Sequence, residues 1–127
     1  MSDIVDIIDH QMKYHNNLKF LKEIEDTEFN DWKTTVYFYI SLHYINYYLR
    51  RKTKAKYYDI KTHTLLFKYL ENNKTRFDKL DDIDEQYHLL YENSIKARYT
   101  CVKISERTVE NQKDAYESIL DICQLRI

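Results

Sequence analysis

Histidine is the side chain of this sequence best suited to acid–base chemistry, because imidazole titrates near neutral pH. Five histidines occur, and no two of them stand four residues apart, as the ligands of a helical zinc site do: His10, His15, His43, His63 and His88. No third ligand accompanies any pair of them. The sequence therefore predicts neither a metal site nor a cofactor.

Two of these histidines lie in informative surroundings. His43 falls within an apolar stretch, where it is either a hydrogen-bonded core residue or an acid–base group in an interface cleft. His63 falls in the first turn of an expected helix, beside a basic segment, and is the better placed of the two to meet a ligand.

The segment from residue 50 to residue 61 is strongly basic. Its six cations face one carboxylate, Asp59, which leaves a local charge of +5: Arg50, Arg51, Lys52, Lys54, Lys56 and Lys61. Tyrosines lie among them and before them, including Tyr57 and Tyr58. Such cations neutralise phosphates and such rings stack on unpaired bases, which predicts nucleic-acid binding. The alternative is a solvated helix end that complements the negative end of the helix dipole.

Arg98 is the only arginine or lysine in the stretch 97–102. The small residue Ser94 lies three positions before this stretch. Either it pairs with a carboxylate of the first helix or it holds a phosphate. Neither Ser-His-Asp nor Cys-His catalysis has a local signature. Cys101 and Cys123 are expected to be buried free thiols.

The composition excludes several classes of protein. Glycine and proline are both absent, so no P-loop, dinucleotide-binding turn or nucleophile elbow can form. Primed hairpin turns also lack their preferred residues, which favours an all-α fold. The net charge is −1, from 20 basic and 21 acidic residues. A nearly neutral chain argues against tight, nonspecific binding to duplexes.

The apolar spacing predicts one domain, residues 1–127, built as an antiparallel bundle of about five helices. The expected helices span roughly residues 3–23, 31–51, 62–73, 81–101 and 106–125. Asn30 or Asp31 is expected to cap the second helix, and Asn72 or Asn73 to end the third in a left-handed conformation. The acidic residues 81–85 complement the start of the fourth helix.

The second of these helices is apolar nearly all round, beginning at Trp32. A helix without a polar face lies at the centre of a bundle or in a subunit interface. No apolar run is long enough to span a membrane, and the acidic start does not resemble a signal peptide. A cytoplasmic location is therefore expected.

Three stretches carry a family resemblance: DWKTTVYFYISLHYINYYL, THTLLFKYL and YHLLYENSIKARY. Together they are similar to the HEPN-like families, small helical bundles named as nucleotide-binding domains of higher eukaryotes and prokaryotes. The matching positions follow the pattern of one subgroup and span slightly over half of the chain: Trp32, His43, His63, Tyr87, Ser94, Ala97, Arg98 and Tyr99.

The resemblance implies an antiparallel bundle, a homodimer packed through its central helices and cleavage of RNA without a metal ion. Many members act as toxins or antiphage effectors, or pair with a nucleotidyltransferase-type antitoxin. On this basis His63, Arg98 and His43 are the expected catalytic residues.

Active members carry an Arg followed by four to six residues and a His. No arginine of this chain is followed by histidine at that distance, although the reverse order occurs between His43 and Arg50. Two hypotheses therefore stay open. One is an RNA-directed protein of a toxin–antitoxin or defence system, and the other is a non-catalytic dimeric bundle that binds a protein partner or a nucleotide.

Overall fold

The computed structural model describes the main chain of residues 2–123 and the side chains of residues 12–123. Over this range the chain forms six helices: α1 (Ser2–Ile24), α2 (Asn30–Lys52), α3 (Tyr57–Ile60), α4 (His63–Asn73), α5 (Leu80–Tyr99) and α6 (Glu106–Cys123). The all-α bundle predicted from the sequence is confirmed. The predicted end of the last helix, at residue 125, lies outside the described residues.

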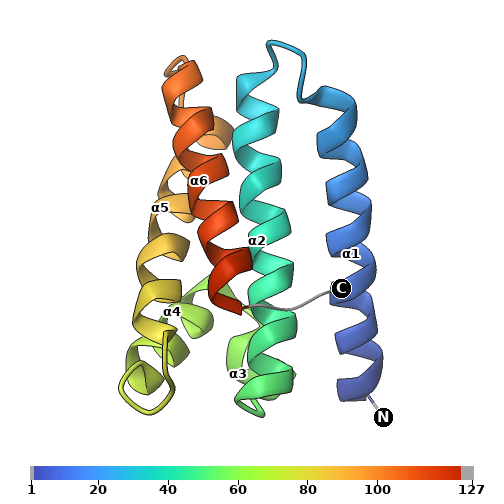
Figure 1. Ribbon diagram of the computed structural model, residues 1–127, viewed down its shortest axis with the longest axis vertical. Helices are drawn as coiled ribbons and strands as arrows, with labels where there is room; N and C mark the ends of the chain where they lie inside the picture. Colours follow the sequence, from blue (N-terminus) through green and yellow to red (C-terminus); the bar gives the residue numbers. More distant parts are fainter. Residues whose placement is uncertain (1, 124–127) are drawn as a thin grey trace.

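Four long helices run alternately up and down along the molecule, and the short helices α3 and α4 lie at one end (Figure 1). Helix α2 packs against α1, α5 and α6. This arrangement places α2 at the centre of the bundle, which is one of the two positions expected for a helix without a polar face. Within the described residues, none of the helices combines the length and hydropathy needed to cross a bilayer.

The centre of the core is aromatic and aliphatic, and it comes from all four long helices and from α4. The side chains of Phe38 and Ile40 on α2 are completely buried, as are Leu66 on α4 and Tyr87 on α5. Trp32 departs from the expectation, since 60% of its surface is exposed. It stands in the first turn of α2, where the chain has only begun to enter the bundle, so one side of the indole stays in solvent.

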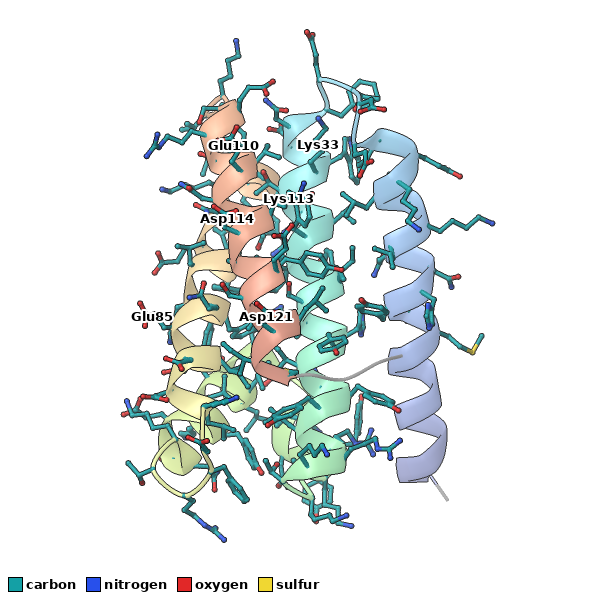
Figure 2. All side chains as sticks on the ribbon, viewed as in Figure 1. Lys33, Glu85, Glu110, Lys113, Asp114 and Asp121 are labelled. Atoms are coloured by element: carbon teal, nitrogen blue, oxygen red, sulfur yellow. The ribbon has the colours of Figure 1, made fainter. Side chains whose placement is uncertain are left out.

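Helix α6 has one polar face toward solvent and one buried face toward the bundle. Figure 2 shows Glu110, Lys113, Asp114 and Asp121 along the visible length of α6, and all four are exposed. The opposite face is buried against α2 and α5: Gln112, Ala115, Tyr116, Ile119 and Cys123. This helix is therefore amphipathic in the usual way.

Gln112 is the one fully buried polar residue on that face, and it joins three helices. Its Nε2 donates to the main-chain oxygen of Thr34 on α2 (3.0 Å) and to that of Leu90 on α5 (3.3 Å). Its Oε1 accepts a hydrogen bond from Asn93 on α5 (3.0 Å). The amide thus ties α6 to both neighbours by directional contacts that apolar packing alone does not provide.

We expect the Gln112→Ala variant to lose about 2 kcal/mol of unfolding free energy, because three buried hydrogen bonds disappear and a small cavity remains. Urea unfolding followed by circular dichroism measures the change. The matched control is Asn111→Ala, an exposed neighbour on the same helix, which should cost no more than about 0.5 kcal/mol. Equal losses in the two variants would show that the buried amide does not hold the helices together.

The ends of the helices differ from the sequence expectations in two ways. Helix α2 begins one residue earlier, after Phe29, without a side-chain cap, and the Asn30 amide donates instead to the Ile104 carbonyl (3.1 Å). Among the described residues, the left-handed positions belong to Lys54 (φ 63°) and Lys79 (φ 71°) rather than to the asparagines. With no glycine in the chain, lysines fill these turns.

The cysteines differ from one another. Both are free, but Cys123 is buried and Cys101 is exposed, so the expectation of two buried thiols is wrong for Cys101. The reason is that α5 ends at Tyr99, two residues before the cysteine. Burial raises the pKa of the Cys123 thiol to about 12.

Candidate functional site

His63 lies in the first turn of α4, where the preceding residue positions it. The Thr62 hydroxyl accepts a hydrogen bond from the Leu65 amide (3.1 Å), so Thr62 caps the helix and fixes its start at His63. The imidazole is half-buried. Its ring packs 5.5 Å from Phe38 and 5.0 Å from Tyr91, measured between ring centroids.

Tyr87 holds the His63 ring in this position. The Tyr87 hydroxyl and His63 Nδ1 are 2.8 Å apart and share a hydrogen bond. Burial raises the pKa of the Tyr87 hydroxyl, so the phenol keeps its proton at neutral pH. With Nδ1 engaged, Nε2 is the ring nitrogen that remains available to a ligand, since the described side chains provide it with no hydrogen-bond partner.

Arg98 lies in the last turn of α5, half-buried and held by hydroxyl groups and aromatic rings. Its Nη1 donates to the Tyr39 hydroxyl (2.9 Å), its Nη2 to the Ser94 hydroxyl (3.2 Å) and its Nε to the Ser94 carbonyl (3.3 Å). The guanidinium carbon lies 5.4 Å from the Tyr39 ring centroid and 5.0 Å from that of Tyr99. Among side chains 12–123 these contacts, and not a carboxylate, position Arg98.

Phe38 brings Arg98 and His63 together. The Arg98 guanidinium carbon lies 5.7 Å from the Phe38 ring centroid, and the His63 ring lies 5.5 Å from the same centroid. The two groups come from different helices and both contact one buried ring. Burial lowers the pKa of His63, and the positive charge of Arg98 lowers it further. At neutral pH the imidazole is therefore uncharged, which is the form that accepts a proton.

The lowered pKa of His63 also makes stability depend on pH. Since the unfolded chain binds this proton more tightly than the folded chain, unfolding becomes easier as the pH falls below about 6.5. We expect the unfolding free energy to fall between pH 7 and pH 5, and the His63→Asn variant to show a smaller fall. Urea unfolding at several pH values measures this slope.

The control for this measurement is His15→Asn. His15 is an exposed histidine on α1, and this substitution should leave the slope in place. An unchanged slope in the His63→Asn variant would mean that His63 does not titrate differently in the folded chain.

His43 shares a surface hollow with His63. The hollow has a volume of about 380 Å³ and is lined by residues of α2, of α3 and of the start of α4: Leu42, His43, Asn46, Ile60, Lys61, Thr62 and His63. His43 is half-buried, so it is neither enclosed in the core nor fully in solvent. Two imidazoles and one ammonium group thus border the same space.

The basic segment divides into an exposed part and a buried part. The exposed side chains surround α3 and lie close in sequence to the hollow: Arg51, Lys52, Lys54, Lys56, Tyr57, Tyr58 and Lys61. Arg50 is only 5% exposed, and its guanidinium carbon lies 5.9 Å from the Tyr57 ring centroid. The structure thus places Arg50 in the interior and the remaining cations on the surface. The short helix α3, which the sequence did not indicate, shapes this surface.

Three residues of the site were not identified as functional from the sequence. Phe38 and Tyr39 were treated as part of an apolar helix, and Tyr91 carried no signal of its own. Their roles depend on which side chains α4 and α5 place beside them, and spacing along the chain does not encode this. In the described part of the chain, no three His, Cys, Asp or Glu side chains gather in a way that could hold a metal ion.

Comparison of the chain with protein-family models, with curated proteins and with solved structures gives no match. The residues and their geometry are therefore the basis for assigning a function.

Proposed function

We propose that this chain is an RNA-directed protein of the HEPN-like type, a ribonuclease in which His63 and Arg98 act on one phosphate. The observation that carries the proposal is the contact of both residues with Phe38, with the pKa of His63 lowered by burial and by Arg98 and with His43 lining one hollow together with His63. A neutral imidazole, a fixed guanidinium and a second imidazole are the groups that transfer within an RNA strand requires.

The reaction uses the ribose 2′-hydroxyl as its nucleophile. His63 Nε2 takes the proton from this hydroxyl while the 2′-oxygen forms a bond to phosphorus. The bond between phosphorus and the 5′-oxygen of the next nucleotide breaks, and His43 gives that oxygen a proton. Arg98 stabilises the extra negative charge on the phosphorane. The products are a 2′,3′-cyclic phosphate and a free 5′-hydroxyl.

The exposed cations around α3 provide the remaining requirement, which is attraction of the RNA backbone. Each cation that contacts a phosphate contributes to affinity and makes that affinity fall with salt. Tyr57 and Tyr58 are 43% and 65% exposed and offer ring faces to unpaired bases. Arg50 is left out of this surface because it is buried.

The test is cleavage of a ribo-oligonucleotide by the purified protein in EDTA, compared with a DNA oligonucleotide of the same sequence. We expect the RNA to be cut and the DNA to stay intact, because DNA lacks the nucleophile. Mass spectrometry of the products should show the cyclic phosphate. Cutting of DNA, or an RNA product without the cyclic phosphate, would contradict the mechanism.

The homodimer and the nucleotidyltransferase-type partner remain proposals that rest on the resemblance. The tyrosines of α2 do not add to them, because Tyr37, Tyr44 and Tyr47 are buried within a single chain. Light scattering gives the mass of the protein in solution, and about 31 kDa is expected for a dimer of the 15.7 kDa chain.

A further inference from the structure

A second hollow, lined by Arg98, lies between the first turns of α2 and the last turn of α5. Its volume is about 400 Å³, and its walls come from six residues: Asp31, Trp32, Thr35, Tyr39, Ala97 and Arg98. This volume falls within the range of small-ligand sites. The mechanism above uses Arg98 alone from this set, so the other groups need an explanation.

Trp32 supplies a flat, solvent-accessible wall of this hollow. The indole is 60% exposed, and its plane is nearly perpendicular to that of the Phe20 ring, with 6.4 Å between the ring centroids and 88° between the planes. Indole faces are good stacking partners for nucleobases, and an exposed one next to a guanidinium is unusual for a residue with only a packing role.

Arg98 keeps two hydrogen-bond donors for a ligand. A guanidinium has five N–H donors, and the three hydrogen bonds to Tyr39 and Ser94 use one from each nitrogen. One N–H on Nη1 and one on Nη2 remain, with no partner among the described side chains. Since the hydroxyls already fix the guanidinium, little conformational entropy is lost when these donors bind a phosphate.

Asp31 supplies the group that reads a base. Asp31 lines the hollow, and its main-chain oxygen accepts from the Thr35 hydroxyl (2.8 Å). Its carboxylate has no hydrogen-bond partner among side chains 12–123. A carboxylate only accepts hydrogen bonds and has two oxygens to do so. Guanine is the base whose Watson–Crick edge presents two neighbouring donors, N1–H and N2–H, to such a pair.

We propose that this hollow is a binding site for a guanine nucleotide, with the base stacked on Trp32, its Watson–Crick edge on Asp31 and its phosphate on Arg98. The role of this site in RNA cleavage rests on the proposed function. If the protein is the proposed ribonuclease, the bound guanosine is the nucleotide next to the scissile phosphate. The protein then cuts RNA preferentially beside guanosine, since unpaired bases of single-stranded RNA are read by stacking together with contacts to their edges.

Trp32 is the only tryptophan in the chain, so its fluorescence reports on this site alone. Titration with guanosine 5′-monophosphate should quench the emission and reach saturation, and adenosine 5′-monophosphate should bind at least about tenfold more weakly. In the Asp31→Asn variant we expect the affinity for the guanine nucleotide to fall about tenfold or more, and the affinity for the adenine nucleotide to change little.

The matched control is Asp26→Asn, since Asp26 is an exposed carboxylate near the start of the α1–α2 turn and does not line this hollow. This variant should bind like the unmodified protein. Calorimetry with Trp32→Ala, where the reporter is lost, should show binding weakened by at least tenfold. Absence of saturable quenching, or equal affinity for the two nucleotides in the unmodified protein, would overturn the proposal.

The outcome is independent of whether the protein cuts RNA. Nucleotide binding without cleavage would contradict the proposed ribonuclease and leave the guanine site standing. Cleavage without any preference for guanosine and without nucleotide binding would remove the guanine site and leave the ribonuclease.

Discussion

The His63→Ala variant should cut RNA at least 100-fold more slowly than the unmodified protein. General acid–base catalysis by a positioned side chain contributes about 10²- to 10⁴-fold to a rate. His63 is the proposed general base, with an uncharged imidazole and a ring held in place. Its lowered pKa keeps the ring neutral, and the Tyr87 hydrogen bond engages Nδ1, so Nε2 is the nitrogen left to accept the proton. Single-turnover cleavage of a labelled oligonucleotide measures the rate.

The control for this variant is His15→Ala, which removes an exposed imidazole from α1, far in sequence from the site. It should cut RNA at the normal rate. Circular dichroism of both variants shows whether the bundle has folded. A folded His63→Ala protein that cuts at the normal rate would remove His63 from the mechanism.

The pH dependence of cleavage gives a second readout of the same group. Because the base form of His63 is required, the rate should fall as the pH drops through the lowered pKa of His63, and it should fall at a lower pH than for an unperturbed histidine. Replacing Arg98 by Gln removes the positive charge that contributes to the shift, so the fall should move to higher pH. An identical pH profile in that variant would contradict the coupling between the two residues.

The Phe38→Ala variant should lose about 3–5 kcal/mol of unfolding free energy, the largest effect on stability that we expect from a single core substitution. Phe38 is completely buried at the centre of the bundle, and its ring packs on Tyr39, Tyr87 and Tyr91 with centroids 5.2–5.8 Å apart. Removing the ring leaves a cavity that four aromatic and imidazole neighbours cannot fill. Urea unfolding at pH 7.5 measures the loss.

Phe29→Ala is the matched control, because Phe29 is the same side chain with 58% of its surface exposed. It should cost no more than about 0.5 kcal/mol. Phe38→Leu, which keeps most of the volume, should cost about 1–1.5 kcal/mol and still fold. A Phe38→Ala loss as small as that of Phe29→Ala would mean that the ring is not part of a packed core.

Phe38→Leu also separates packing from function. The variant retains an apolar side chain but loses the aromatic ring that both Arg98 and His63 contact. We expect a folded protein with cleavage reduced about tenfold, because small displacements of catalytic groups have large effects on rate. Cleavage at the normal rate would show that the shared ring is not needed to position the two groups.

The fold class could be predicted from local chemistry. A chain without glycine or proline cannot easily form hairpins, and apolar residues at helical spacing must lie on one side of a helix that buries them. The long helices therefore appear within a few residues of their expected limits. The helix ends were harder to predict, because groups distant in sequence can form hydrogen bonds with the residues expected to cap a helix. Asn30, for instance, bonds to the Ile104 carbonyl instead of capping α2.

Exposure could not be predicted residue by residue. Arg50 belongs to a basic run in the sequence and yet is buried, whereas Trp32 begins the most apolar helix and yet is exposed. Both outcomes follow from where α2 enters and leaves the bundle, because a position near the end of a helix is covered only if another segment reaches it.

The amino-acid sequence alone was sufficient for the helical architecture and for the choice of His63 and Arg98 as candidates, and it limited α2 to the bundle centre or a subunit interface. Tertiary packing decided that these two residues share the ring of Phe38, that Tyr87 holds the imidazole and that Asp31 and Trp32 border a hollow beside Arg98. The physical reason is range. Helix formation depends on residues a few positions apart, whereas a site depends on the register between helices, which is set by the packing of the whole core.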